Sequence, residues 1–233
     1  MGALVGSFVS AVSFRYPRGI NFVSGRSFCP KCRSNISFYD NIPLISFSLL
    51  GAKCRSCKKK ISIRYPLIEI SCALGFLAIH LMTLPFYIYL VFIVLISLFV
   101  MDIEERIIPD EFVFVTSFLV LTVFLITDFS GLYSHLLSGF LAAVFLLLIH
   151  LVTRGKGMGL GDVKFAILAG IILGYPLFVI WLFLSFLTGA LVAIILILTR
   201  KAGLKDKIAF GPFLIVSLVI SYLWGEAILR AIF

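Results

Sequence analysis

Residues 177–199 read LFVIWLFLSFLTGALVAIILILT and contain no charged side chain. A helix needs roughly 17–25 apolar residues to cross the hydrocarbon core of a bilayer, and this stretch meets that length. The whole chain has the same character, because only 13% of its 233 residues are charged, whereas soluble domains carry about 25%. These observations exclude an entirely soluble domain and a disordered chain, and they indicate a polytopic membrane protein.

Eight apolar stretches form such a span or come near it in length. They cover residues 1–14, 67–84, 86–101, 112–127, 132–153, 163–174, 177–199 and 208–229. The first and the sixth are short: the 14 residues of the first make a helix of about 21 Å, and the sixth is shorter still. We therefore predict an all-α polytopic membrane protein with about eight transmembrane helices.

Most of the positive charge lies in one segment. Residues 15–64 hold 11 Lys or Arg and a single acid, Asp40, so this segment carries +10 and the rest of the chain −1. Cytosolic loops of membrane proteins are enriched in Lys and Arg, which places residues 15–66 in the cytosol. If the eight spans alternate from there, 19 of the 20 basic residues lie in the cytosolic connections or, for Lys164, just beyond one. We prefer an N-out helix over a signal peptide for residues 1–14, because the basic residues follow this apolar run.

This topology divides the chain into three regions. Residues 1–14 form transmembrane helix 1, residues 15–66 form a small cytosolic module between helices 1 and 2, and residues 67–233 form a membrane domain with helices 2–8.

The basic module also resembles a nucleic-acid-binding element. Its flanking membrane helices account better for its charge, which would attract anionic lipid headgroups. We expect the lipid bilayer as a partner and no nucleic acid; a membrane-tethered nucleic-acid binder would show salt-dependent binding.

Four of the five cysteines form two CxxC pairs in the basic module, Cys29 with Cys32 and Cys54 with Cys57. Each CxxC turn can present two thiolates to one ion, and two such turns complete a tetrahedral zinc site. Disulfides and a redox CxxC are the alternatives. A reducing cytosol disfavours disulfides, and a redox pair would not need a second copy. We predict a structural zinc site, with Cys72 as a packing residue in an apolar helix.

Acidic residues lie at two of the predicted cytosolic boundaries. Asp102 opens DIEERIIPD after the third apolar stretch, and Asp162 ends GMGLGD before the sixth. Two neighbouring carboxyl groups share one proton, so one can take a proton from water while the other polarises a carbonyl. Gly159 and Gly161 would let backbone and substrate come close. Lys164 could bias the charge of the pair or meet an acidic substrate group.

This chemistry is that of an aspartic protease, and two alternatives stay open. Charged residues near helix ends are often boundary residues whose charges reach the headgroups. A non-enzymatic transporter or assembly factor could use the acids for ion coupling, although coupling acids usually lie in the middle of the bilayer.

The motifs together resemble the bacterial type IV prepilin peptidases, or prepilin leader peptidase/N-methyltransferases, which are GxGD-type aspartic proteases. The resemblance rests on GALVGSFVSAVSFRYPRG (2–19), the CPKC and CRSC pairs, YDNIPLISF (39–47), ISIRYPLIE (61–69), DIEERIIPDE (102–111), GMGLGDVK (157–164) and FGPFL (210–214). It implies that Asp102 and Asp162 are the catalytic pair and that residues 159–162 are the GxGD signature. It also implies that the four cysteines of the two CxxC pairs hold the metal.

The resemblance further implies a substrate, a second activity and a location. Such enzymes remove the basic leader of type IV prepilins and pseudopilins after a glycine, at the cytosolic face of the bacterial inner membrane. The four cysteines suggest a second activity, which methylates the new N-terminal residue with S-adenosylmethionine. No glycine-rich loop of the dinucleotide-binding kind follows a strand pattern, so the sequence assigns no residue to the methyl donor. The zinc module and the active site would both face the cytoplasm.

Overall fold

The structure is a computed structural model of the 233-residue chain, and it describes residues 1–22, 25–200, 203 and 208–232. These residues form helices joined by loops, with two isolated β-bridges and no β-strand among them. The predicted all-α class is therefore confirmed. The α-helices are α1 (Gly2–Arg15), α2 (Ile45–Leu49), α3 (Arg64–Leu81), α4 (Tyr87–Glu105), α5 (Asp110–Thr127), α6 (Leu132–Val152), α7 (Leu160–Leu173), α8 (Leu177–Leu198) and α9 (Gly211–Ile232).

Each of the eight predicted apolar stretches forms a helix. Within the described part of the chain, six helices are long and apolar enough to cross a membrane: α3, α4, α5, α6, α8 and α9. The other two, α1 and α7, have 14 residues each and therefore a length of only about 21 Å. The polytopic class is thus confirmed, with six helices of membrane-spanning length and two shorter ones among the described residues.

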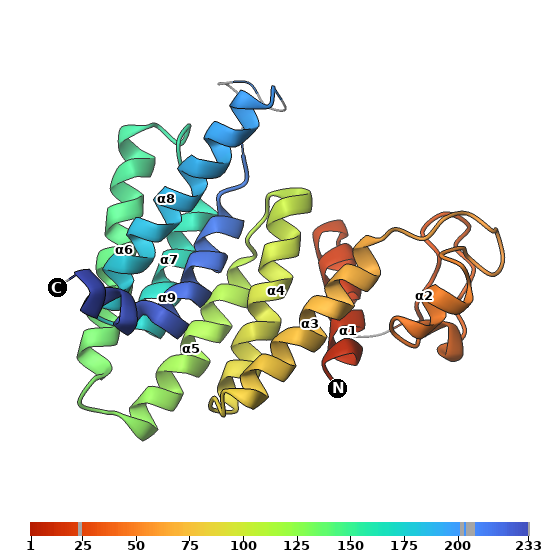
Figure 1. The fold of residues 1–233 in the computed structure, drawn as a ribbon, viewed down its shortest axis with the longest axis horizontal. Helices are drawn as coiled ribbons and strands as arrows, with labels where there is room; N and C mark the ends of the chain where they lie inside the picture. The colour runs from red at the N-terminus through yellow and green to blue at the C-terminus, as the bar shows by residue number, and fades with distance from the viewer. Residues whose placement is uncertain (23–24, 201–202, 204–207, 233) are drawn as a thin grey trace. The chain divides into compact units, whose positions relative to one another are not determined.

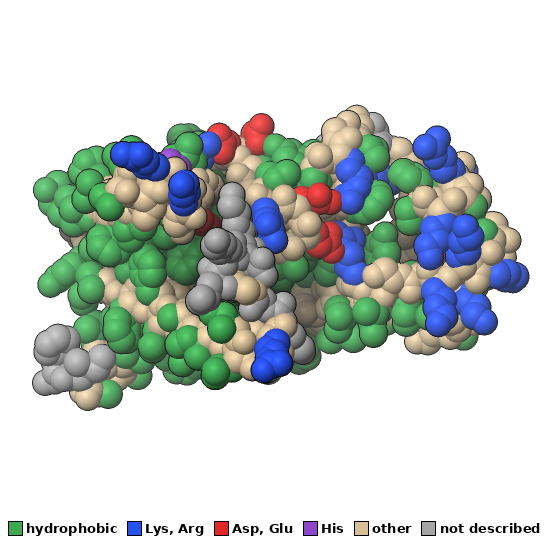
Figure 2. Space-filling view, turned by 90° about the horizontal axis from the view of Figure 1, so that it is seen from above, with side chains coloured by type: hydrophobic (Ala, Val, Ile, Leu, Met, Phe, Trp, Pro, Cys, Tyr) green, Lys and Arg blue, Asp and Glu red, His purple; other side chains and the backbone are tan. Residues whose placement is uncertain are grey.

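The long helices keep large apolar side chains on their outer surfaces. Phe118 of α5, Phe140 of α6 and Phe183 of α8 are 73%, 64% and 64% exposed. Figure 2 shows hydrophobic side chains over much of one face of the molecule. Contact of such surfaces with water is unfavourable, whereas the apolar core of a bilayer matches them.

The chain divides into two compact units, Met1–Met101 and Asp102–Phe233. In the first unit, α1 packs along α3 (Figure 1). Two glycines of α1 permit this close approach, because a Cβ at Gly2 or Gly6 would lie 2.7 or 2.6 Å from a Cα atom of α3. Cys72 is fully buried in the core cluster of this unit, as expected for a packing residue.

The segment between α1 and α3 holds the short elements of the first unit. They are the 3-10 helices η1 (Tyr16–Arg18) and η2 (Phe38–Asn41), and α2. Figure 2 shows Lys and Arg side chains gathered over this segment. The predicted basic module thus has little regular secondary structure among its described residues.

In the second unit, α7 lies at the centre and packs against α5, α6, α8 and α9 (Figure 1). The contact with α6 is close, because a Cβ at Gly170 would lie 2.6 Å from Gly139 Cα. The indole Nε1 of Trp181 in α8 donates to the Leu214 carbonyl of α9 at 2.8 Å. Neighbouring helices therefore surround α7, and the beginning of α9 is tied to α8.

Candidate functional site

The four cysteines of the CxxC pairs lie together in the first unit. One sulfur atom from each of Cys29, Cys32, Cys54 and Cys57 lies within 4.8 Å of the others. Four sulfur ligands at about 2.3 Å around a tetrahedral ion would be about 3.8 Å apart. The Sγ atoms of Cys29 and Cys57 are 4.0 Å apart, close to that separation. The cluster could therefore hold a metal ion, and this donor set is the one that zinc prefers.

The two CxxC turns have the same backbone geometry. The Cys29 N–H donates to Ser34 O and the Cys54 N–H to Lys59 O, both at 2.9 Å. The residue after each pair, Arg33 or Lys58, has a φ of 57°, and an isolated β-bridge closes each turn. Two copies of one turn thus present two sulfurs each.

The Cys32 thiol has a lowered pKa. Its Sγ lies 3.0 Å from the Ser34 hydroxyl. Hydrogen bonds from the Ser34 side chain and backbone lower the pKa of the Cys32 thiol to about 6. Because the thiolate is the form that binds metals, this ligand is available at neutral pH.

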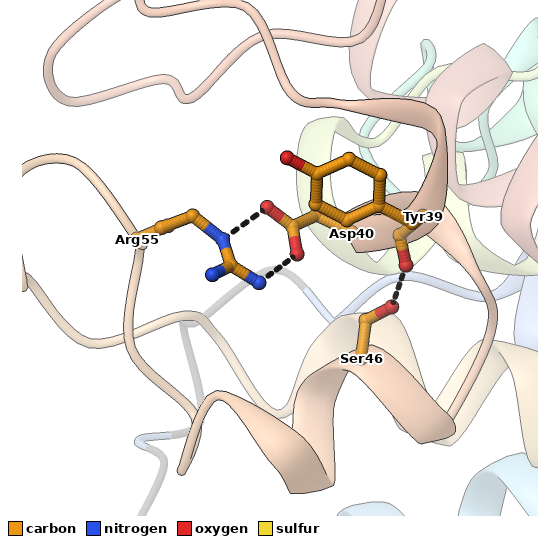
Figure 3. Close-up of polar contacts among 4 residues, drawn as sticks. All are labelled: Tyr39, Asp40, Ser46 and Arg55. Carbon is orange, nitrogen blue, oxygen red and sulfur yellow. Dashed lines mark hydrogen bonds and ion pairs between the residues drawn. The ribbon is translucent and has the colours of Figure 1, made fainter.

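An ion pair joins η2 to the second CxxC turn (Figure 3). Arg55 Nε and Nη2 donate to the two carboxylate oxygens of Asp40, at 2.8 and 2.7 Å, and this pairing lowers the pKa of Asp40. The guanidinium also lies over the Tyr39 ring at 5.5 Å, and Ser46 Oγ of α2 donates to Tyr39 O at 2.9 Å. The YDN turn is thus tied to both α2 and the turn between Cys54 and Cys57. Sequence reasoning missed this pair, although a lone acid in a strongly basic segment is a signal for one.

Glu69 anchors the same segment to α3. Its side chain is buried, and Oε2 accepts the Leu44 N–H at 2.9 Å. Leu44 has a φ of 62°, which is an unfavourable conformation for a residue with a branched side chain. The buried carboxyl therefore holds a strained turn at the beginning of α2.

The two predicted catalytic aspartates both lie in the second unit. Asp102 lies near the end of α4 and Asp162 in the first turn of α7, and they are only 6% and 8% exposed. Asp162 Oδ2 accepts the Gly159 N–H at 3.1 Å, and the charge of Asp102 acts on Asp162. Asp102 Oδ2 is buried and has no hydrogen-bond partner among the described residues. The structure thus places two shielded carboxyl groups within electrostatic reach of each other.

The supporting residues predicted beside Asp162 have defined positions. A Cβ at Gly161 would lie 3.1 Å from Ile108 Cβ, so this glycine lets the loop after α4 pack on the GxGD turn. Lys164 Nζ binds both carboxylate oxygens of Asp110, at 2.7 and 2.6 Å. Lys164 therefore joins the beginnings of α5 and α7, a partner that the sequence did not predict.

These positions define what the second unit can do chemically. Buried carboxyl groups ionise reluctantly, and two that interact tend to hold one proton between them. Such a pair can accept a proton from water and donate one to a carbonyl oxygen. Peptide-bond hydrolysis needs both steps.

Comparisons with known proteins agree with this chemistry. Residues 1–83 match the model of the Bacterial Peptidase A24 N-terminal domain, and residues 89–194 match the Type IV leader peptidase family. No solved structure matches the chain significantly.

Three curated relatives share the name prepilin leader peptidase/N-methyltransferase. The protein from Pseudomonas aeruginosa is 32% identical, over 99% of this chain and 90% of its own. The Bacillus subtilis protein is 32% identical, over 98% of this chain and 93% of its own. The Aeromonas hydrophila protein is 35% identical, over 90% of this chain and 75% of its own.

Proposed function

Because this chain belongs to the type IV leader peptidase family, we propose that it removes the basic leader of type IV prepilins or pseudopilins and methylates the new N-terminus. The observation that carries the cleavage activity is the pair of buried, interacting carboxyl groups, Asp102 and Asp162. Near full-length similarity to relatives named for both activities supports the second one. The substrates are then membrane-inserted chains whose leader lies in the cytoplasm.

In the proposed mechanism, one carboxylate of the pair takes a proton from water. The resulting hydroxide attacks the carbonyl carbon of the leader's final glycine, while the protonated partner donates its proton to the carbonyl oxygen. The C–N bond of the tetrahedral intermediate then breaks, and the leaving amine takes a proton from the pair. The Gly159 N–H holds Asp162 in a fixed orientation throughout.

We assign a structural zinc ion to Cys29, Cys32, Cys54 and Cys57. Four cysteine ligands close the coordination shell, so such a site has no open position for substrate. Zinc bound there would join the two CxxC turns, whose own hydrogen bonds and the Asp40–Arg55 pair orient the sulfurs. The role of the site is therefore to hold the module in shape.

Mass spectrometry tests the two activities together. Purified protein is incubated with a prepilin, with and without S-adenosylmethionine. We expect loss of the leader in both samples, and one added methyl group on the product only when the methyl donor is present. A cleaved product that lacks the methyl group would contradict the proposed methyltransferase activity. An uncut prepilin would contradict the proposed peptidase activity.

We also propose a topology, with residues 15–66 in the cytoplasm and residues 1–14 and 67–233 in the bacterial inner membrane. Its support is the distribution of Lys and Arg.

Cysteine labelling at Ser130 and Lys156 tests this topology, because the two residues lie in opposite connections and are both exposed. In intact spheroplasts, a membrane-impermeant maleimide should label the Ser130→Cys variant and leave Lys156→Cys unlabelled until the membrane is permeabilised. The reverse pattern would contradict the proposed orientation.

A further inference from the structure

The carboxyl group of Asp102 lies against the first residue of α9. Gly211 is buried, and a Cβ built on it would lie 2.5 Å from Asp102 Oδ2 and 2.9 Å from Cγ. Cβ atoms in proteins essentially never lie within 3.0 Å of a non-bonded heavy atom. Any side chain at position 211 therefore requires the carboxyl group or the helix to move.

The first turn of α9 is held more firmly than the short Asp102 side chain, although both are buried. Asp102 is 6% exposed, and its neighbour Met101 is fully buried. On the other side, Leu214 in the first turn of α9 is also fully buried, and its carbonyl accepts the 2.8 Å hydrogen bond from Trp181. A substituent at position 211 would thus be relieved mainly by displacement of the short Asp102 side chain.

The beginning of α9 also acts electrostatically on the Asp102 carboxyl group. The first turn of a helix carries unsatisfied N–H groups and a partial positive charge. In α9, Pro212 has no N–H, and the Phe213 and Leu214 N–H groups bond to the Phe210 carbonyl at 3.0 and 3.3 Å. The backbone amide of Gly211 lies within electrostatic reach of the Asp102 carboxyl group, whose Oδ2 makes no hydrogen bond to any described residue.

We propose that Gly211 is a positioning residue for cleavage: because it has no side chain, the beginning of α9 can meet the Asp102 carboxyl group and hold it in its working orientation beside Asp162. The inference rests on the proposed peptidase function. It adds a third helix to the site, since α4 carries Asp102, α7 carries Asp162 and α9 sets the position of the first carboxyl group.

The test is the Gly211→Ala variant, with Gly225→Ala as its control in the same helix. A Cβ at Gly225 meets Leu177 Cδ2 at 2.7 Å, which is the end of a flexible side chain that can turn away. We expect Gly211→Ala to lower kcat for prepilin cleavage at least about 100-fold, the usual loss when an acid–base group is displaced. KM should change little, and Gly225→Ala should cleave like the wild type. Methylation of a substrate that already lacks its leader should continue in both variants.

A second measurement separates positioning from a general loss of folding. The thermal unfolding midpoint is compared for Gly211→Ala in the wild-type and in the Asp102→Ala backgrounds. If the added methyl group meets the carboxyl group, it should lower the midpoint less when the carboxyl group is absent. Wild-type cleavage by Gly211→Ala, an equal loss of methylation, or equal midpoint changes in the two backgrounds would each overturn the inference. Failure of the wild-type protein to cleave would instead count against the proposed function.

Discussion

Replacing Asp102 or Asp162 with Asn is expected to reduce prepilin cleavage by about 10²- to 10⁴-fold, the range associated with loss of a general acid or base. Asparagine keeps the size of the side chain but cannot exchange a proton, and each variant leaves one carboxyl group without its partner. Either substitution alone should therefore be enough to cause this loss. The measurement is the fraction of prepilin that loses its leader over time.

Two controls make this result specific. Asp128→Asn changes an exposed aspartate in the loop before α6, whose carboxyl group bonds to the Ser130 hydroxyl and the Gly131 N–H; it should cleave like the wild type. Both active-site variants should also insert into membranes and unfold at temperatures near that of the wild type. If Asp102→Asn and Asp162→Asn both cleave at the normal rate, the pair does not perform the chemistry.

The Cys29→Ser/Cys57→Ser variant is expected to lose its bound zinc and to destabilise the module. One sulfur is removed from each CxxC turn, so only two ligands remain. Apparent binding free energies for structural zinc are about 10–16 kcal/mol in zinc-finger peptides, and the module has little regular structure to replace that contribution. Elemental analysis should show about one zinc per wild-type chain and almost none in the variant.

The fifth cysteine provides the matched control. Cys72 is fully buried between apolar neighbours in the first unit, so Cys72→Ala removes a sulfur atom without touching the cluster. It should retain its zinc, and its module should resist limited proteolysis as the wild type does. Full zinc content in the Cys29→Ser/Cys57→Ser variant would rule out the four-cysteine site.

Local patterns in the sequence predicted the helices well but not their ends. An apolar run marks a span, yet the helix continues through polar residues when its backbone groups need partners. Thus α4 continues to Glu105 and α7 begins at Leu160, which places both aspartates inside helices rather than in the flanking loops. The four-cysteine cluster was predictable because each CxxC turn is short and its geometry is local.

Contacts between distant segments could not be predicted in this way. Arg55 pairs with Asp40, Lys164 with Asp110, and Glu69 with the Leu44 N–H, and no spacing rule links these residues. Each depends on how helices and loops meet in three dimensions. The close approach of Gly211 to Asp102 is of the same kind, since a glycine at the beginning of a helix gives no sign of what it faces.

The most direct test of the central claim is the N-terminal sequence of a prepilin after incubation with the purified wild-type protein. We expect a product that begins with the residue following the leader's glycine, together with an intact prepilin when either Asp102→Asn or Asp162→Asn replaces the wild type. An unchanged N-terminus with folded wild-type protein, or the same new N-terminus with both variants, would contradict it.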